Sequence, residues 1–235
     1  QEGFTAVGLY SHSDIDVIQA WLASDRSTPQ PFATPYNTSL AQLLPGDIMY
    51  KDMNEDGKID DNDISWIGNG DIPKINYGFG FNLEYRALAL GMLFQGTAQA
   101  NRFVGGIVKP FNDSGGGNVY ANITDRWTEE NPRHDVFYPR LAYGNDQAGN
   151  QNNFVNSTWW LKDMSFLRLK TLQLSYRIPK EWGQKVGVDN ANIYTMGMNL
   201  FTFSKWKLWD PELNTGNGNS YPNTSSFTVG LNFNF

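Results

Sequence analysis

The C-terminal stretch of the chain alternates strictly between large apolar and small or polar side chains. Its apolar positions are Phe227, Val229, Leu231, Phe233 and Phe235. The positions between them are Thr228, Gly230, Asn232 and Asn234. A period of two residues is typical of a β-strand with one apolar and one polar face. Such a strand fits either the edge of a soluble core or the wall of a membrane barrel, which has lipid on one face and water on the other.

The same alternation recurs upstream in segments of about ten residues, the length with which a tilted strand crosses a bilayer. Strands of soluble domains are shorter, at about five or six residues. The first apolar series is Ile75, Tyr77, Phe79, Phe81, Leu83 and Tyr85, followed by Leu88, Leu90, Met92 and Phe94. Two later series are Leu172, Leu174, Tyr176 and Ile178, and then Tyr194, Met196, Met198 and Leu200. We expect all of these series to face lipid.

The number of strands predicts that the chain is part of a larger barrel. The segment from Phe4 to Tyr10 adds one strand and makes roughly six, whereas the smallest single-chain bacterial barrels have about eight. An open sheet edge is not viable in lipid. We therefore expect an all-β fold in which residues 1–235 form an antiparallel segment of a transmembrane β-barrel, and we expect the chain to be a piece of a longer protein.

The lengths of the connections predict which side of the membrane they occupy. With the C-terminus on the inner side, the strand directions place long loops outside, at about 11–74, 98–163 and 204–224. The inner connections are a turn near Tyr85 and Arg86 and the segment 179–190. Short inner turns and long outer loops are typical of outer-membrane barrels. By parity, Arg168 and Lys170 fall on the lipid-facing side near the outer end of their strand, so we expect them among the lipid headgroups.

The composition excludes several classes of protein. The net charge of -6 argues against a nucleic-acid-binding protein, which would carry a basic patch. The absence of cysteine excludes disulfides and thiolate metal sites. The two histidines, His12 and His134, are far apart in sequence, and neither has metal-ligand spacing with the other. We find no other catalytic constellation and expect that the protein is not an enzyme.

The outer loops contain a helical pattern and several aromatic side chains. Ile15, Ile18 and Trp21 recur at helical spacing and predict a helix from Asp14 to Ser24, capped by Ser13 or Asp14. Aromatic residues in or beside the loops are Trp159, Trp160, Trp206, Trp209 and Tyr221. They fit either packing and membrane-interface anchoring or stacking on a sugar ligand. The sequence singles out no residue as a substrate contact.

A run of twelve residues matches a calcium-binding loop. Oxygen donors occupy positions one, three, five, nine and twelve, and Lys58 at position seven would offer its backbone carbonyl. The expected ligands are therefore Asp52, Asn54, Asp56, Lys58, Asp60 and Asp63. Gly57 at position six permits the sharp turn. The alternative is an acidic turn whose side chains bond their own backbone. If Ca²⁺ binds, we expect it to stiffen an outer loop, and we expect no organic cofactor.

Many short motifs in order resemble the SusC/RagA family of TonB-dependent outer-membrane transporters. The run from Pro45 to Asp60 resembles that family's PGD-x-x-Y-K-D-x-N-x-D-G-x-I stretch. Further similar motifs are Ile67-Gly68-Asn69, Phe94-Gln95-Gly96, Arg126-Trp127-Thr128, Phe166-Leu167-Arg168-Leu169-Lys170, Asn199-Leu200-Phe201-Thr202 and Asp210-Pro211-Glu212. The resemblance covers the chain from about Pro45 onward.

This resemblance implies a fold, a function and partners. Members of the family are barrels of about 22 strands with an N-terminal plug. They import nutrients, usually oligosaccharides and sometimes peptides, across the outer membrane of Bacteroidota. A SusD-like lipoprotein covers them from outside, and TonB–ExbB–ExbD supplies energy through an N-terminal box. Residues 1–235 contain neither plug nor TonB box, so the resemblance implies the C-terminal part of such a barrel. Phe235 would be the residue read by the barrel-assembly machinery.

Three alternatives stay open beside glycan import. The first is a peptide importer of the same family. The second is an outer-membrane barrel without a transport function. The third is a secreted, calcium-stabilised carbohydrate-binding β module. A sandwich of this last kind needs a core between two sheets, whereas one face of each strand here carries mostly Gly, Asn, Thr and Ser.

Overall fold

The computed structural model describes residues 1–109, 119–141, 150–183 and 187–234. The chain divides into two compact units. The loop unit comprises Gln1–Gly68 and Phe103–Lys162, and the sheet unit comprises Asn69–Arg102 and Asp163–Phe235. The chain passes from one unit to the other between Gly68 and Asn69, within β7 (Asn101–Phe103) and within β8 (Leu161–Asp163).

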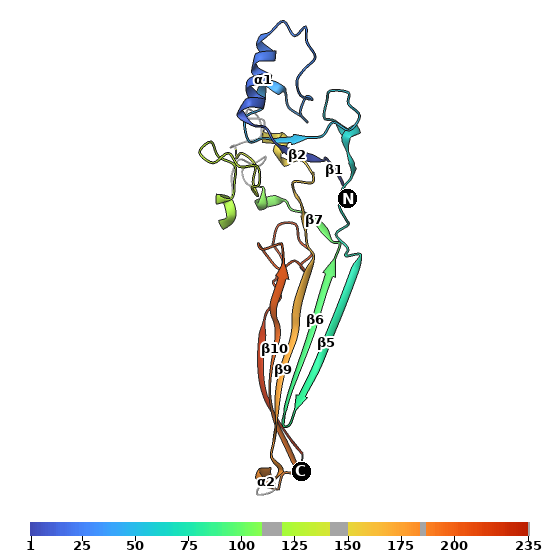
Figure 1. Ribbon diagram of the computed structural model, residues 1–235, viewed down its shortest axis with the longest axis vertical. Helices are drawn as coiled ribbons and strands as arrows, with labels where there is room; N and C mark the ends of the chain where they lie inside the picture. The colour runs from blue at the N-terminus through green and yellow to red at the C-terminus, as the bar shows by residue number, and fades with distance from the viewer. Residues whose placement is uncertain (110–118, 142–149, 184–186, 235) are drawn as a thin grey trace. The chain divides into compact units, whose positions relative to one another are not determined.

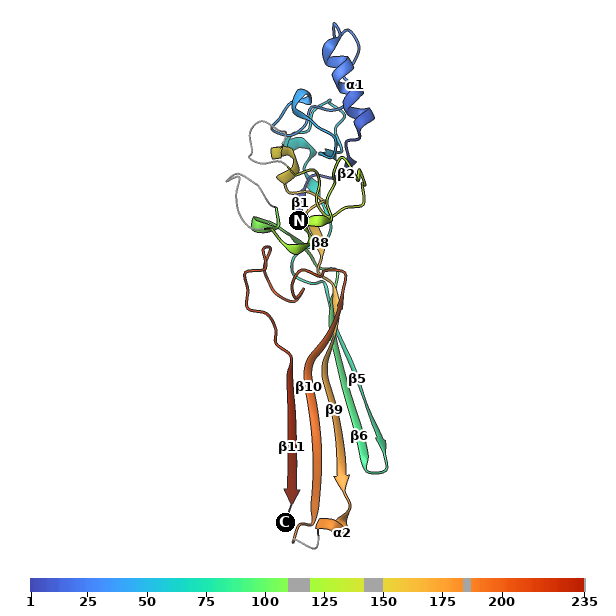
Figure 2. The ribbon, with the colours of Figure 1, turned by 90° about the vertical axis from the view of Figure 1, so that its left-hand side faces the viewer.

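The sheet unit is built on five antiparallel strands in the order β11–β10–β9–β6–β5. Figure 1 shows β5, β6, β9 and β10 side by side, and Figure 2 shows β11 beside β10. The strands are β5 (Ile75–Tyr85), β6 (Leu88–Ala98), β9 (Phe166–Ile178), β10 (Asn190–Ser204) and β11 (Ser226–Asn234). The long antiparallel strands predicted from the alternating pattern are confirmed.

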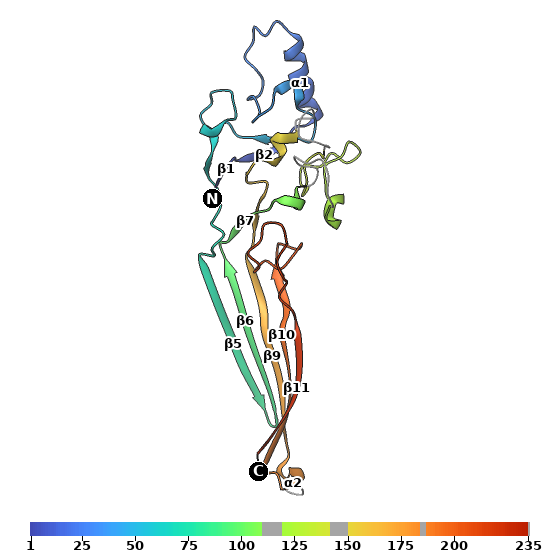
Figure 3. The ribbon, with the colours of Figure 1, turned by 180° about the vertical axis from the view of Figure 1, so that it is seen from behind.

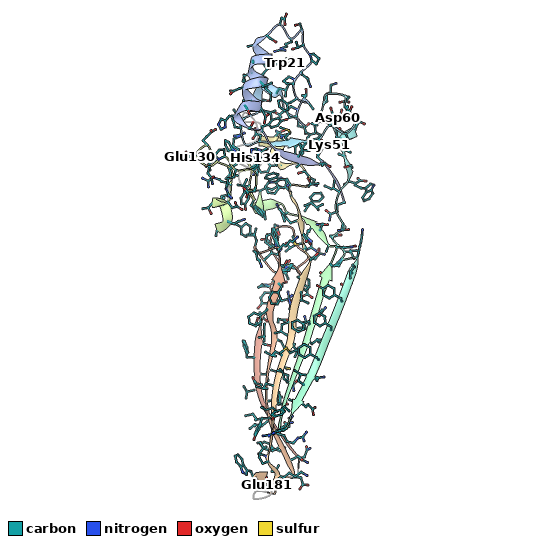
Figure 4. All side chains as sticks on the ribbon, viewed as in Figure 1. Trp21, Lys51, Asp60, Glu130, His134 and Glu181 are labelled. Carbon is teal, nitrogen blue, oxygen red and sulfur yellow. The ribbon has the colours of Figure 1, made fainter. Side chains whose placement is uncertain are left out.

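The short connections of this sheet lie at one end and the long connections at the other. Arg86, in a left-handed conformation with φ 57°, turns the chain between β5 and β6. The short helix α2 (Lys180–Gly183) follows β9, and Figure 3 shows it at the same end as the C-terminus. Glu181 marks this helix in Figure 4. At the opposite end, residues 205–225 connect β10 to β11.

The apolar face of the sheet is exposed. Phe227 is 78% and Phe201 61% exposed, and Phe79 stacks on Phe94 with 5.0 Å between ring centroids. Large exposed apolar patches mark a surface that meets lipid or another protein. The sheet unit therefore has the two-faced character that the sequence predicts for a membrane wall.

The loop unit contains short elements packed around apolar clusters, one of which includes Phe4, Ile48 and Trp127 and another Ile15, Ile18 and Leu43. Its strands are β1 (Glu2–Gly3), which pairs with β4 (Ser65–Trp66), and β2 (Ala6–Leu9), which pairs with β3 (Ile48–Tyr50). Its 3₁₀ helices are Leu40–Gln42, Asp61–Asp63, Gly106–Val108, Ala121–Thr124 and Asn150–Phe154. The prediction that Phe4 to Tyr10 forms another strand of the long sheet is wrong, because this segment pairs with β3 instead, with a register irregularity between Ala6 and Gly8.

The predicted helix in the first loop is confirmed as α1 (His12–Ala23), but its predicted cap is wrong. Ser11 caps the helix, because its Oγ accepts the Asp14 N–H, and the Asp14 carboxylate accepts the Ser11 N–H in return. This reciprocal capping box satisfies two free backbone donors. Ile15 and Ile18 are buried against Leu43 and its neighbours, as their helical spacing predicts.

Candidate functional site

The polar face of the sheet differs from the sequence prediction in β10. Directly paired residues of antiparallel strands lie on the same face. Tyr194 pairs with Ser175, Met196 with Gln173, and Met198 with Thr171. These three large side chains therefore lie on the polar face, and the prediction that they face lipid is wrong. The apolar face of β10 carries Ile193, Thr195 and Gly197, which pair with Tyr176, Leu174 and Leu172.

Irregular pairing around Lys170 reverses the alternation of β9 near the end that carries the long connections. Between Met198 and Phe201, the two residues Asn199 and Leu200 stand opposite the single residue Lys170 of β9. Asn199 adopts a left-handed conformation with φ 53°. Leu200 lies over Gly197, since a Cβ at Gly197 would meet its methyl groups at 2.8 Å. Relative to β6, β9 carries Lys170 as an extra residue, because Thr171 pairs with Leu93 and Leu169 pairs with the next residue, Phe94. This extra residue reverses the alternation of β9 beyond it.

The bulge places Arg168 on the polar face, where it pairs with Thr202 and Gln95. Its side chain is buried, at 1% exposure, rather than among headgroups, so that prediction is wrong. The guanidinium forms an ion pair with Asp210 and a second one with Glu212, in which Nη1 lies 3.0 Å from Oε2. Lys170 is the residue of β9 that has no directly paired neighbour at the bulge.

Two arginines, Arg102 and Arg168, bind a turn of the 205–225 connection through hydrogen bonds and ion pairs. In this turn, Asp210–Leu213, the Leu213 N–H donates to the Asp210 carbonyl. The Asp210 carboxylate accepts the Glu212 N–H at 3.0 Å while it pairs with Arg168. Arg102 donates from Nη1 to the Leu213 carbonyl. The contact between these segments was not predicted; the available signal was the acidic pair Asp210 and Glu212 in a loop at the same end of the sheet as Arg168.

A cavity of about 250 Å³ lies beside this turn within the sheet unit. Its floor is apolar and buried, and includes Ala100, Met164, Phe166 and Pro211. Its polar lining includes Asp71, Arg102, Glu212 and Asn214. Burial lowers the pKa of Arg102, and the carboxylate of Asp71 opposes this effect. The Nε of Arg102 is buried and has no hydrogen-bond partner in the described part of the chain.

The acidic and amide side chains of the predicted calcium loop accept hydrogen bonds from backbone N–H groups of the same loop. Asp52 accepts the N–H groups of Glu55 at 2.7 Å and Gly57 at 2.8 Å through its two oxygens. Asp63 likewise accepts those of Met53 and Asp60. Asn54 accepts the N–H of Asp56, Asp56 that of Lys58, and Asp60 that of Asn62. Gly57 has φ 82° at the turn, and Asp60 is labelled in Figure 4.

The side-chain donors of this loop are all oxygens, which a hard dication such as Ca²⁺ prefers, and they follow the sequence positions of a calcium-binding loop. Among the described residues, however, no three acidic or histidine side chains converge as a metal site. The carboxylates of Asp52 and Asp63 would have to keep their backbone bonds and accept the ion with their remaining lone pairs. The expected ligand set of Asp52, Asn54, Asp56, Lys58, Asp60 and Asp63 therefore stays a prediction.

A buried polar network fixes the centre of the loop unit. The carboxylate of Asp47 is fully buried, and it accepts hydrogen bonds from Leu44 N, Asn153 Nδ2 and the Arg140 guanidinium. Burial raises the pKa of Asp47 to about 6, although Arg140 and the hydrogen bonds act in the opposite direction. Asn153 also accepts the Ile48 N–H at 2.8 Å. The network joins the start of β3 to the segment near residue 153.

The aromatic residues divide between packing and exposure. Trp160 is buried and donates from Nε1 to the Asn153 carbonyl at 2.7 Å, and Trp159 donates to the Phe137 carbonyl. Trp206 is buried and meets Trp209 edge to face, with centroids 4.6 Å apart. Tyr221 is 85% exposed. Packing therefore accounts for Trp160 and Trp206, while the ring of Tyr221 is exposed.

The two histidines have different surroundings. His12 pairs with Glu129 at the loop unit's surface, with 2.5 Å between Nε2 and Oε2. His134 is exposed.

Within the described ranges, no helix is long and apolar enough to cross a membrane.

The sequence is similar to TonB-dependent receptors, although no family model matches it. TonB-dependent receptor P26 of Formosa agariphila is 34% identical over 202 residues, which cover 81% of this chain and 20% of that protein. Receptor P3 of the same organism is 29% identical, with 81% and 19% covered. TonB-dependent receptor SusC of Bacteroides thetaiotaomicron is 31% identical over 104 residues, with 40% and 10% covered. The chain spans about a fifth of the length of the two Formosa relatives.

Solved structures share the fold. The RagAB peptide importer in its open-open state matches with a TM-score of 0.61 and 23% identity, covering 100% of this chain and 22% of that chain. A structure of the RagAB peptide transporter matches with a TM-score of 0.63 and 22% identity, covering 99% and 22%. The proteins found by both comparisons are receptors and transporters and not enzymes.

Proposed function

Because this chain belongs to the SusC/RagA family of TonB-dependent receptors, we propose that it forms wall and outer loops of an importer in the outer membrane. The observation that carries the proposal is the five-stranded antiparallel sheet with one apolar and one polar face. The apolar face would meet lipid, and the polar face would line the interior of a larger barrel. The open edges at β5 and β11 would pair with further strands, because lipid does not tolerate unpaired backbone groups.

The connection lengths support the orientation of this wall. The turn at Arg86, the helix α2 and the C-terminus share one end of the sheet, which we assign to the periplasm. The 205–225 connection shares the opposite end with the start of β9, which we assign to the cell exterior. The long loops at about 11–74, 98–163 and 204–224 would then contact nutrients and partners.

The nutrient that we propose is an oligosaccharide, taken up with a SusD-like lipoprotein and with energy from TonB–ExbB–ExbD. Amide and hydroxyl side chains are frequent on the polar face of the sheet, as at Asn82, Gln173 and Asn232, and in the 205–225 connection, and such groups suit neutral hydroxylated ligands. A peptide is the second candidate, since the matched RagAB structures are of a peptide importer. In the same proposal, Phe235 is recognised by the barrel-assembly machinery and Ca²⁺ stiffens the 52–63 loop.

Uptake in cells tests the function. The gene for the whole transporter is deleted from its source bacterium and then restored, and uptake of fluorescently labelled oligosaccharides and peptides is measured with and without active TonB. We expect oligosaccharide uptake that needs both the gene and TonB. Gene-dependent uptake of peptides alone would replace the oligosaccharide by a peptide. Uptake of every nutrient at the same rate without the gene would contradict the proposed function.

A further inference from the structure

We propose that the cavity beside the Asp210–Leu213 turn binds a single ring of a neutral sugar; this inference rests on the proposed function in oligosaccharide import. The cavity measures about 250 Å³ and lies on the polar face of the sheet unit, at the end that carries the long connections. Its position would place it at the outer mouth of the barrel, where an entering oligosaccharide first meets the wall.

The chemistry of the lining favours a neutral, hydroxylated ligand. Carboxylates only accept hydrogen bonds and a guanidinium only donates them. Asp71 and Glu212 supply acceptors, and Arg102 supplies donors, including an Nε–H that has no acceptor among the described residues. A hydroxyl group both donates and accepts, so a sugar ring satisfies both kinds of group. An anion would offer no hydrogen-bond donor to the carboxylates, and a cation would offer no acceptor to the Nε–H of Arg102.

Glu212, one of the two carboxylates at the cavity, is already paired within the protein. It forms an ion pair with the buried Arg168, which also pairs with Asp210. Asp71 makes no ion pair with the described residues, and its carboxylate partly offsets the lowering of the Arg102 pKa by burial. A charged ligand that displaced Arg168 from Glu212 would leave a buried charge unpaired, which costs free energy. A neutral ligand adds hydrogen bonds without disturbing the pairs.

The shape of the lining also suits a sugar ring. Buried apolar side chains, including Phe166 and Pro211, form the floor, and polar groups of exposed residues, including Asp71 and Asn214, stand around it. A sugar ring presents C–H groups on its faces and hydroxyl groups at its edge, and could lie on the floor with its edge toward these groups. Binding sites of this kind are mostly apolar with a few polar groups that fix orientation.

The neighbouring loop offers a second contact for the rest of the oligosaccharide. Asn223 donates to Glu212 Oε2 at 2.9 Å and so holds its own segment at the rim. Tyr221 precedes it by two positions and is 85% exposed. An exposed aromatic ring with a polar hydroxyl is suited to stacking on the apolar face of a sugar while its hydroxyl stays in water.

Binding measurements on the whole transporter test this site. Asp71 and Asn214 are exposed, and neither makes an ion pair or side-chain hydrogen bond with other described residues, so Asp71→Ala and Asn214→Ala should fold normally. Asn219→Ala is the matched control, because Asn219 lies exposed in the same loop but does not line the cavity. Calorimetry in detergent uses laminarihexaose, xylohexaose and mannohexaose as neutral probes and penta-alanine as a peptide probe.

We expect at least one of the hexasaccharides to bind, with affinity lowered about tenfold by Asp71→Ala, by a smaller factor by Asn214→Ala, and unchanged by Asn219→Ala. Unchanged affinity in both cavity variants, or binding of penta-alanine alone, would overturn the proposal, as would no binding of any hexasaccharide. TonB-dependent uptake of the bound hexasaccharide is measured in parallel. If the hexasaccharide is taken up but binds the cavity variants with unchanged affinity, the cavity is rejected as its site while the proposed import function stands. If the cavity variants bind it more weakly but it is not taken up, the import function is rejected while the cavity stands as a binding site.

Discussion

Arg140 and Asp47 form a buried ion pair across 93 positions of sequence, with Arg140 Nη2 lying 2.8 Å from Asp47 Oδ1. Asp47 belongs to the PGD motif just before β3, and its carboxylate is fully buried. Asn153 donates to the same carboxylate and at the same time accepts from Ile48 N. Three distant segments of the loop unit therefore meet at one carboxylate, and its charge state affects how firmly they are joined.

We expect the loop unit to open more easily as the pH rises from about 4 to above 6. Burial raises the pKa of Asp47 to about 6 in the folded unit, against an ordinary value of 3.8. Because the folded state favours the protonated form, its contribution to stability is complete below pH 4 and is lost as the pH rises through 6. A shift of this size corresponds to about 3 kcal/mol. Hydrogen exchange of residues 44–50 in the whole transporter, corrected for intrinsic exchange, measures the opening free energy.

The control for this titration is Asp47→Asn, which has no ionisable group. In this variant the pH dependence of opening between about 4 and 6 should disappear, whereas the exposed Asp135→Asn should keep it. If the slope persists in Asp47→Asn, another group titrates in this range and Asp47 is not responsible.

Replacement of Arg168 by Met should release the Asp210–Leu213 turn. The buried guanidinium pairs with Asp210 and Glu212, and removal of one partner of a buried pair costs about 3–5 kcal/mol. We expect faster hydrogen exchange and faster proteolysis in residues 205–225. Arg177→Met is the matched control, because Arg177 lies exposed on the same face of the same strand and forms no ion pair with the described residues. Equal protection of the loop in the two variants would contradict the role of Arg168.

Much of the sheet could be predicted from sequence because alternation is a local property. The series from Ile75 to Tyr85 and from Phe227 to Phe233 each lie on one face, as predicted. In β10, large residues occupy both phases, for example Tyr194 and Ile193, so the pattern alone does not determine which phase faces lipid. The pairing of Tyr194 with Ser175 determines it, and pairing is not visible in a single strand.

The candidate site was predictable only in part, for a related physical reason. The side chains of the 52–63 loop act within a few residues of each other, so their spacing shows in the sequence. Arg168 and Asp210 meet across 42 positions, and a bulge at Lys170 reverses the parity that would have indicated the contact. Contacts between distant segments depend on register and bulges, which the sequence does not display.

The register of β10 predicts opposite environments for two adjacent residues. Thr195 pairs with Leu174 on the apolar face, and Met196 pairs with Gln173 on the polar face. Nitroxide labels on Thr195→Cys and Met196→Cys, introduced one at a time into the whole transporter in liposomes, report these environments. We expect the label at 195 to be relaxed mainly by oxygen, which concentrates in lipid, and the label at 196 mainly by a water-soluble nickel complex. The reverse result would restore the assignment made from alternation alone.

Calcium should stabilise the 52–63 loop of the whole transporter. The ion would gather oxygen ligands that now accept only backbone N–H groups, such as those of Asp52 and Asp63. We expect calcium-binding heat in calorimetry and slower hydrogen exchange of residues 52–63, with both effects reversed by a chelator. Asp56→Ala should abolish them, because it removes a proposed ligand. Asp61→Ala should retain them, because Asp61 is not in the ligand set and its carboxylate accepts from the Tyr36 hydroxyl. Absence of heat in the unmodified protein would identify the loop as an acidic turn stabilised by its own backbone bonds.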